Sequence, residues 1–301
     1  MYLIGIISYL PNETKLRQKR LKSHIQQLKE LRSIFKDIFI YDVLQNYTED
    51  EIKLLNVDGY KVFDTGIGAG PARNEVLDYY YNSNYNTLLM LDDDTSFYNY
   101  YNVGEILEDI EALDDKRIGL VTSLIPMLTP FKEINYQYEK IINNNFILHT
   151  KFQSLTSIGA TYIITKYLKE KRLHFENLDP TKNEGYEDMD FYFKVLDSGF
   201  AIYKCNQLIM KLILMDDSTI FKDREGRQSL MKNNMKVMYE KYKYLGLELK
   251  TPTSFNLDKV YYGNNIDVNM INVPRKEKYI FTEDVKYVPK NMKILEKNSL
   301  F

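Results

Sequence analysis

The first 125 residues alternate short apolar runs with stretches that carry an apolar residue at every third or fourth position. Runs of the first kind predict buried strands, and the second spacing predicts amphipathic helices. The predicted strands cover 2–9, 37–43, 60–64, 86–92 and 118–125, and the predicted helices cover 14–35, 48–55, 71–81 and 103–113. Strands and helices in this order predict an α/β fold with a doubly wound, mostly parallel sheet.

The pattern is less regular from residue 126 onward. The stretch 130–165 is rich in β-forming residues and predicts a mixed β region. Further elements are expected as a helix over 187–198 that ends before Gly199, strands over 200–203 and 209–215, and a C-terminal helix over 228–244. Residues 251–301 have no clear period and predict an extended arm, so we expect one domain over 1–250 followed by that arm.

The composition is that of an ordinary globular protein, with 44% hydrophobic and 27% charged residues among 301. No apolar stretch is long enough to predict a transmembrane helix. Met1–Leu10 lacks a basic start and a small-residue cleavage site, so it predicts a first strand instead of a signal peptide. The single cysteine, Cys205, excludes an internal disulfide framework and favours a reducing compartment, so we expect a cytoplasmic protein.

Charge is distributed unevenly along the chain. Residues 218–301 carry 16 Lys and Arg against 10 Asp and Glu, and the preceding part carries 24 against 32. A basic tail on an acidic body hints at a polyanionic partner, and a solvated tail is the simpler alternative. The three histidines are scattered, so any metal site is expected to use oxygen ligands.

The strongest candidate for chemistry is the sequence Asp92-Asp93-Asp94, which follows the apolar run Thr87–Leu91. Three adjacent charges are too costly to bury in a core, so they must lie where the strand ends. Ligands of open α/β sheets bind at the carboxyl ends of the strands. Adjacent carboxylates there suit a hard cation such as Mg²⁺, although an acidic turn exposed to solvent is the simpler alternative.

Two further stretches are expected near the same edge of the sheet. The glycine-rich loop Gly66–Gly70 precedes a helix whose first turn contains Arg73 and Asn74, and free N–H groups at a helix start attract anions. Its spacing matches neither the dinucleotide fingerprint nor a Walker loop. In the second stretch, Glu187 and Asp188 open a predicted helix, where they either complement the helix dipole or supply a general base.

These stretches, in this order, resemble the GT-A glycosyltransferases, in particular the family 2-like members, over about residues 1–245. Asp92–Asp94 is similar to the family's DxD motif, and Gly70-Pro71-Ala72-Arg73-Asn74 to its Arg-Asn after the third strand. Ser157–Ala160 is similar to its acceptor-side Gly-Ala, and Glu187-Asp188 to its Glu-Asp helix start. The resemblance implies a nucleotide-sugar half over 1–125 and an acceptor half over 126–250.

The resemblance also implies roles for individual residues. The donor would be a nucleotide-diphosphate sugar, most simply a UDP-sugar, with Mn²⁺ or Mg²⁺. The residues implied for each role are Asp94 and Asp92 for the metal, Gly70, Arg73, Asn74, Asp92 and Asp93 for the donor, and Asp188 with Glu187 for catalysis. Asp217 follows another predicted strand, where it is either a loop residue or a further metal ligand. Many family members use a late histidine as a metal ligand. Here Asp216 and Asp217 stand in that region, which leaves the third ligand open.

The acceptor also stays open. Ile7–Pro11 and Tyr80–Tyr85 are similar to phage-encoded GT-A enzymes, some of which glycosylate modified DNA bases, and the basic region 218–301 would then contact DNA. A phage-encoded protein would act in the host cytoplasm. The alternatives are a cell-envelope glycan or protein acceptor, a nucleotidyltransferase, and a non-catalytic carbohydrate- or DNA-binding module. A nucleotidyltransferase would need a basic glycine-rich signature after the first strand, which Ser8–Pro11 does not provide.

Overall fold

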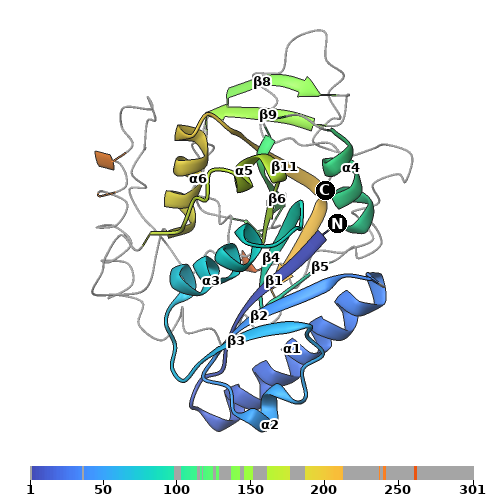
Figure 1. Ribbon diagram of the computed structural model, residues 1–301, viewed down its shortest axis with the longest axis vertical. Coiled ribbons are helices and arrows are strands. Elements are labelled where there is room, and N and C mark those ends of the chain that lie inside the picture. Colours follow the sequence, from blue (N-terminus) through green and yellow to red (C-terminus); the bar gives the residue numbers. More distant parts are fainter. Residues whose placement is uncertain are drawn as a thin grey trace.

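The structure is a computed structural model of the chain (Figure 1). It describes residues 2–35, 37–97, 103–113, 116, 118–124, 127–128, 137–142, 146–151, 161–176, 187–212, 237, 240–241 and 261–262. Most of the described buried apolar side chains form one continuous core around a ten-stranded sheet.

Four parallel strands form the first half of this sheet. They are β1 (Tyr2–Tyr9), β2 (Phe39–Gln45), β3 (Gly59–Phe63) and β4 (Thr87–Asp92), in the spatial order β3-β2-β1-β4. Ile7 pairs with Val43 on one side and with Asp92 on the other. The carboxyl ends of β1, β2 and β4 therefore meet at one edge, and Asp92 lies at that edge.

Helices cover both faces of these strands. On β2, Asp42 reaches His24 of α1 (Thr14–Ile34), whereas its neighbour Tyr41 stacks on Tyr79 of α3 (Ala69–Tyr81). Adjacent strand residues point to opposite faces, so α1 and α3 lie on opposite sides of the sheet. The short helix α2 (Glu49–Ile52) begins with the capping box predicted by its sequence. The expected doubly wound α/β sheet is confirmed.

Two glycines are required by the contact between α3 and the sheet. A Cβ on Gly5 would lie 2.1 Å from Cγ1 of Val76, so only glycine lets α3 approach β1 this closely. Gly68 precedes the helix with φ of 92°, a left-handed conformation that favours glycine. The helix begins two residues before Pro71, slightly earlier than the sequence predicted.

The second half of the sheet mixes strand directions, as expected. Strand β10 (Thr161–Ile164) is antiparallel to both β4 and β6 (Ile118–Leu124), and β11 (Ala201–Leu212) is parallel to β6. The remaining strands of this half are β9 (Phe146–Lys151), β8 (Gln137–Ile142) and β5 (Thr95–Phe97), all joined by antiparallel pairing, and a separate pair of β7 (Met127–Leu128) with β12 (Tyr261–Tyr262). The helices of this half are α4 (Val103–Leu113), α5 (Lys166–Lys169) and α6 (Glu187–Asp197).

Two predictions about this half need correction. The strands expected over 200–203 and 209–215 are one strand, β11, because pairing with β6 continues through an irregularity between Cys205 and Ile209. Strand β5 was not predicted, and it forms because the chain after the acidic turn pairs with the far end of β11. Of the C-terminal helix expected over 228–244, only residues 237, 240 and 241 are described, and they are helical. The extended arm over 251–301 lies outside the described residues apart from β12.

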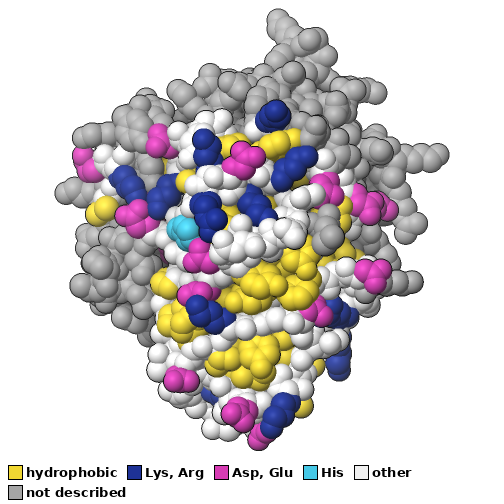
Figure 2. Space-filling view, viewed as in Figure 1, with side chains coloured by type: hydrophobic (Ala, Val, Ile, Leu, Met, Phe, Trp, Pro, Cys, Tyr) yellow, Lys and Arg dark blue, Asp and Glu magenta, His cyan; other side chains and the backbone are white. Residues whose placement is uncertain are grey.

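The face that carries α3, β2 and β3 is rich in hydrophobic side chains, with charges of both signs around them (Figure 2). Tyr41 and Tyr79 stack there with ring centroids 4.0 Å apart, and Phe39 stacks on Tyr79 at 5.8 Å. These rings cover the part of the sheet that α3 leaves open.

No helix within the described residues is long and apolar enough to cross a membrane.

Candidate functional site

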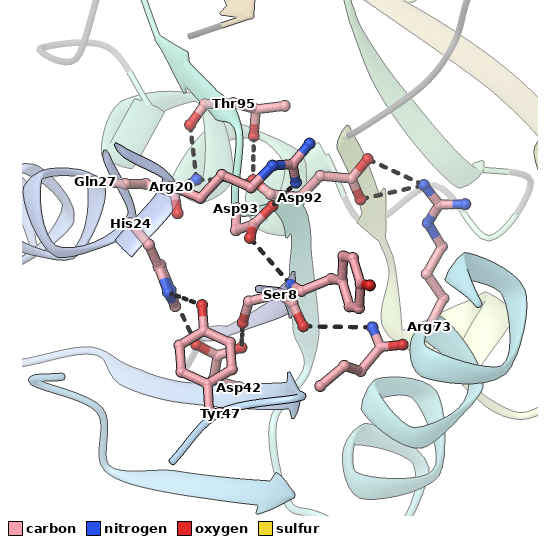
Figure 3. A network of polar contacts seen from close by, with 12 residues as sticks. Ser8, Arg20, His24, Gln27, Asp42, Tyr47, Arg73, Asp92, Asp93 and Thr95 are labelled. Atoms are coloured by element: carbon pink, nitrogen blue, oxygen red, sulfur yellow. Dashed lines mark hydrogen bonds and ion pairs between the residues drawn. The ribbon is translucent and has the colours of Figure 1, made fainter. Parts of the chain in front are cut away.

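The acidic turn at the end of β4, Asp92–Asp94, is held in shape by hydrogen bonds to its backbone (Figure 3). The Thr95 hydroxyl donates to the carbonyl of Asp92 at 2.7 Å. The side-chain amide of Gln27, from α1, donates to the carbonyls of Asp92 (2.9 Å) and Thr95 (2.7 Å). The buried amide therefore fixes the turn against α1, and the three carboxylates leave it in defined directions.

Asp93 and Asp94 differ in what they contact. The Asp93 carboxylate accepts a hydrogen bond from the backbone N–H of Tyr9 at 3.1 Å and lies 3.8 Å from the Arg20 guanidinium. Asp94 is partly exposed and forms no salt bridge with any residue that the structure describes. Asp93 is thus held by the protein more tightly than Asp94.

The turn carries more negative charge than its neighbours neutralise. Burial raises the pKa of Asp93 to about 6, even though Arg20 lowers it. Burial, and then the charges of Asp93 and Asp92, raises the pKa of Asp94 to about 7. A bound cation would relieve this repulsion, and carboxylate oxygens are the ligands that Mg²⁺ and Mn²⁺ prefer. The donor set at this turn therefore fits a hard divalent cation.

The protein alone does not complete such a site among the described residues. No three His, Cys, Asp or Glu side chains in that part of the chain are grouped so that they could hold a metal ion. Mg²⁺ commonly takes one or two carboxylates and fills its remaining positions with water and phosphate oxygens. The expected third ligand, Asp217, and its neighbour Asp216 lie outside the described residues.

Arg73 joins the acidic turn to the start of α6. Its side chain is buried, with 5% exposed, and Nη2 donates to both carboxylate oxygens of Asp92 at 3.1 Å. Nη1 donates to Oε1 of Glu187 at 3.0 Å. Burial disfavours the charged guanidinium, but the negative charge of Asp92, with that of Glu187, raises the pKa of Arg73 well above its ordinary value. One buried cation therefore binds carboxylates from both halves of the chain.

Aromatic rings enclose this guanidinium. Cζ of Arg73 lies 5.4 Å from the ring centroids of both Tyr162 and Phe175. Phe175 stacks on Phe191 of α6 with centroids 4.2 Å apart. The Asn74 side chain donates to the Phe175 carbonyl (2.9 Å) and accepts from its N–H (2.7 Å). Arg73 and Asn74, adjacent in sequence, thus both connect α3 to the second half of the chain.

Three acids, Glu187, Asp188 and Asp190, lie in the first turn of α6, and they differ in their contacts. Asp190 is fully buried and lies 2.8 Å from the ammonium of Lys241 and 3.1 Å from that of Lys194. Glu187 is held by Arg73. Asp188 is partly exposed, and its charge contributes to raising the pKa of Tyr162, after burial. Asp188 thus lies at the surface end of the same turn that Arg73 and the lysines hold.

A buried polar network supports the turn from the α1 side (Figure 3). His24 is completely buried, and its Nε2 lies 3.0 Å from Oδ2 of Asp42, while Nδ1 lies 3.0 Å from the Tyr47 hydroxyl. The Ser8 hydroxyl donates to the other Asp42 oxygen. Burial lowers the pKa of His24, but the charge and hydrogen bond of Asp42, with the charge of Asp93, together raise it above its ordinary value. This network locks α1, β1 and β2 together beside Tyr9, which donates to the acidic turn.

The structure brings only some of the predicted site residues together. Asp92, Arg73 and Glu187 are in direct contact, and Asp93 and Asp94 share the same turn. Gly70 and Asn74, which were also predicted to bind the donor, have different surroundings. Gly70 is buried in the first turn of α3, and both polar groups of the Asn74 side chain are bonded to backbone. Ser157–Ala160 and Gly185–Tyr186 lie outside the described residues.

Sequence reasoning missed the polar residues that hold the site. Arg20, His24 and Gln27 are spaced by four and three positions, so they lie on one face of α1, toward the sheet. Because these residues are polar, the hydrophobic pattern did not identify them as part of the buried face. Their helical spacing is the signal in the sequence that would have done so. Tyr162 and Phe175 were assigned to no role, because nothing in the sequence connects them to Arg73.

The sequence and the fold can be compared with those of known proteins. No protein-family model and no curated protein matches the sequence. Mannosyltransferase PcManGT from Pyrobaculum calidifontis, solved with GDP-Man and Mn²⁺, is 11% identical with a TM-score of 0.44, over 70% of this chain and 56% of that one. S. aureus TarS 1–349 is 14% identical with a TM-score of 0.46, over 84% and 76%. A putative glucose-1-phosphate thymidylyltransferase from Bacillus anthracis is 14% identical with a TM-score of 0.43, over 70% and 89%.

The chain spans little more than half the length of the mannosyltransferase. At these identities and scores the likenesses assign no activity, and they include enzymes of two different transferase classes. The function must be argued from the site.

Proposed function

We propose that this protein is a metal-dependent GT-A glycosyltransferase that transfers a sugar from a UDP-sugar to an acceptor hydroxyl. The observation that carries the proposal is the partly exposed carboxylate of Asp94 at the carboxyl edge of the parallel strands, where burial and its acidic neighbours raise its pKa to about 7. Across Arg73 from this turn lie the acids of α6. A cation-binding edge facing a candidate base suits transfer from a diphosphate donor.

Asp94, with Asp92, would hold Mn²⁺ or Mg²⁺, and Asp217 remains a candidate third ligand. Such a cation, when bound, neutralises the charge of a diphosphate leaving group. Gly70 lies in the first turn of α3, where backbone N–H groups favour donor phosphates. Asp93 would hold the Tyr9 backbone at the entrance to the donor site through the hydrogen bond described above.

Asp188 would accept the proton of the acceptor hydroxyl. The N-terminus of α6 favours the ionised carboxylate that a base requires, and the side chain is partly exposed. This role belongs to an inverting reaction. A retaining reaction has no need of it, so the anomeric configuration of the product distinguishes the two.

For the acceptor we propose a hydroxymethylated base in DNA, contacted through the basic region 218–301, with a cell-envelope glycan or protein as the alternative. The proposal of a DNA acceptor is supported by two clusters of basic residues in this region, which would contact the phosphate backbone. They are Lys222, Arg224, Arg227, Lys232 and Lys236, and then Arg275, Lys276 and Lys278.

The proposal is tested by thermal unfolding with a panel of nucleoside diphosphates, each with and without Mn²⁺. A ligand present at ~100 times its dissociation constant adds ~2.7 kcal/mol of stability, which a melting curve resolves. We expect UDP to stabilise the protein only when Mn²⁺ is present. Stabilisation by nucleoside triphosphates and not by diphosphates, with pyrophosphate released from the triphosphate when a sugar 1-phosphate is added, would instead identify a nucleotidyltransferase.

A further inference from the structure

The hydrogen bonds that the structure describes for Arg73 go to protein carboxylates. Its Nη2 is shared by both oxygens of Asp92 and its Nη1 is bonded to Glu187. Its Nε is buried without a hydrogen-bond partner among the described residues, and the rings of Tyr162 and Phe175 lie over the guanidinium. The side chain is only 5% exposed, so its position is set by contacts within the protein.

The two carboxylates come from parts of the chain that the fold brings together. Asp92 is the last residue of β4, in the first half, and Glu187 is the first residue of α6, in the second. They are 23% and 14% exposed, against 5% for the Arg73 side chain between them. Because the guanidinium is planar and its donors are fixed in a fork, it sets the separation of the two carboxylates more strictly than a flexible ammonium would.

The surroundings make this link rigid. Asn74 fixes the backbone of Phe175 through two hydrogen bonds, and Phe175 stacks both over Arg73 and against Phe191 of α6. The same residues that shield the charge from water thus also position the helix. Ion pairs removed from water are stronger and less screened than exposed ones.

We propose that Arg73 is a positioning residue, which fixes the acidic turn of β4 relative to the first turn of α6. Building on the proposed function, it would hold the metal-side carboxylate Asp92 at a set distance from the base Asp188. This differs from the nucleotide-binding role that the family resemblance implies for Arg73.

The first test follows backbone amide exchange of the first two turns of α6, which requires no substrate. We expect Arg73→Met and Glu187→Gln each to accelerate exchange there about tenfold, with no further increase in the double variant. Arg73→Lys should recover only part of the protection, because one ammonium cannot bond both carboxylates as the fork does. Arg172→Met, which removes an exposed arginine bonded to Asn82, is the matched control and should leave α6 unchanged.

The second test measures calorimetric binding of UDP with Mn²⁺ to the same variants. The positioning role predicts that Glu187→Gln binds UDP within about twofold of the unmodified protein but releases UDP from a UDP-sugar at least tenfold more slowly. Unchanged exchange in α6, together with a tenfold loss of UDP affinity in Arg73→Lys, would assign Arg73 to the nucleotide and overturn the proposal. If no UDP binds at all, the proposed function fails, while the exchange experiment still decides the role of Arg73.

Discussion

Removing the charge of Asp94 from the acidic turn should make the metal-free protein more stable. Burial and the charges of Asp93 and Asp92 raise the pKa of Asp94 from 3.8 to about 7, so the folded state disfavours the ionised form. Below pH 4 the carboxyl is neutral in both states and costs nothing. The cost grows as the pH rises toward 7 and is complete above it. Asp94→Asn removes the charge at nearly constant size.

The expected gain follows from the size of this shift. One pKa unit corresponds to about 1.4 kcal/mol, so the full rise would correspond to about 4 kcal/mol. Asp94 is partly exposed and solvent screens part of the repulsion, so we expect Asp94→Asn to stabilise the protein by about 1–3 kcal/mol at pH 8. That gain raises the melting temperature by about 2–4 °C per kcal/mol for a protein of this size.

The assay is urea unfolding in EDTA at pH 4 and pH 8. Asp64→Asn is the matched control, because Asp64 is an exposed acid in the loop after β3, and it should change little at either pH. Asp94→Asn should approach the stability of the unmodified protein at pH 4 and exceed it at pH 8. If the variant is equally stable or less stable at pH 8, the turn is not electrostatically strained and the argument for a cation there is wrong.

Four further predictions follow from single contacts or from the basic tail. Asp188→Asn should keep UDP affinity and slow sugar transfer by ~10²–10⁴-fold, as loss of a general base typically does; unchanged turnover would remove Asp188 from this role. Gln27→Leu should loosen the acidic turn and cost about 1–3 kcal/mol in urea unfolding, because the buried bond to the Thr95 carbonyl is lost and the Asp92 carbonyl keeps only the Thr95 hydroxyl as a donor. Gly5→Ala should cost about 1–3 kcal/mol by forcing Val76 away, and a neutral result would contradict the close packing of α3. Hydroxymethylated duplex DNA should bind more tightly at low salt and lose binding on deletion of 270–301; no binding at ~50 mM salt would favour a glycan or protein acceptor.

The sequence predicted those parts of the fold that depend on local pattern. The apolar runs located β1–β4, the Thr48 capping box located α2, and the acids after Leu91 could lie only at a strand end. The break within β11 was predicted wrongly, because pairing with β6 and β9 outweighs a polar interruption in the run. Long-range pairing of this kind is invisible to periodicity.

The sequence identified the acidic residues of the candidate site, but it did not identify the residues that they contact. Asp92 and Glu187 could be identified as candidates from their positions at element ends, but the bond of each to Arg73 depends on how α3 packs. His24 and Gln27 are polar residues on the buried face of α1, and their partners are Asp42 and the acidic turn. Polar residues on a buried helix face are explained only by what the neighbouring strands present to them.

Metal-dependent donor binding at the acidic turn is tested by a calorimetric titration of UDP into the unmodified protein and into Asp94→Asn, each with and without Mn²⁺. We expect the unmodified protein to bind UDP only with Mn²⁺, and the variant to stay folded and show no metal-dependent binding. Equal Mn²⁺-dependent binding of UDP by a folded Asp94→Asn protein would contradict this expectation.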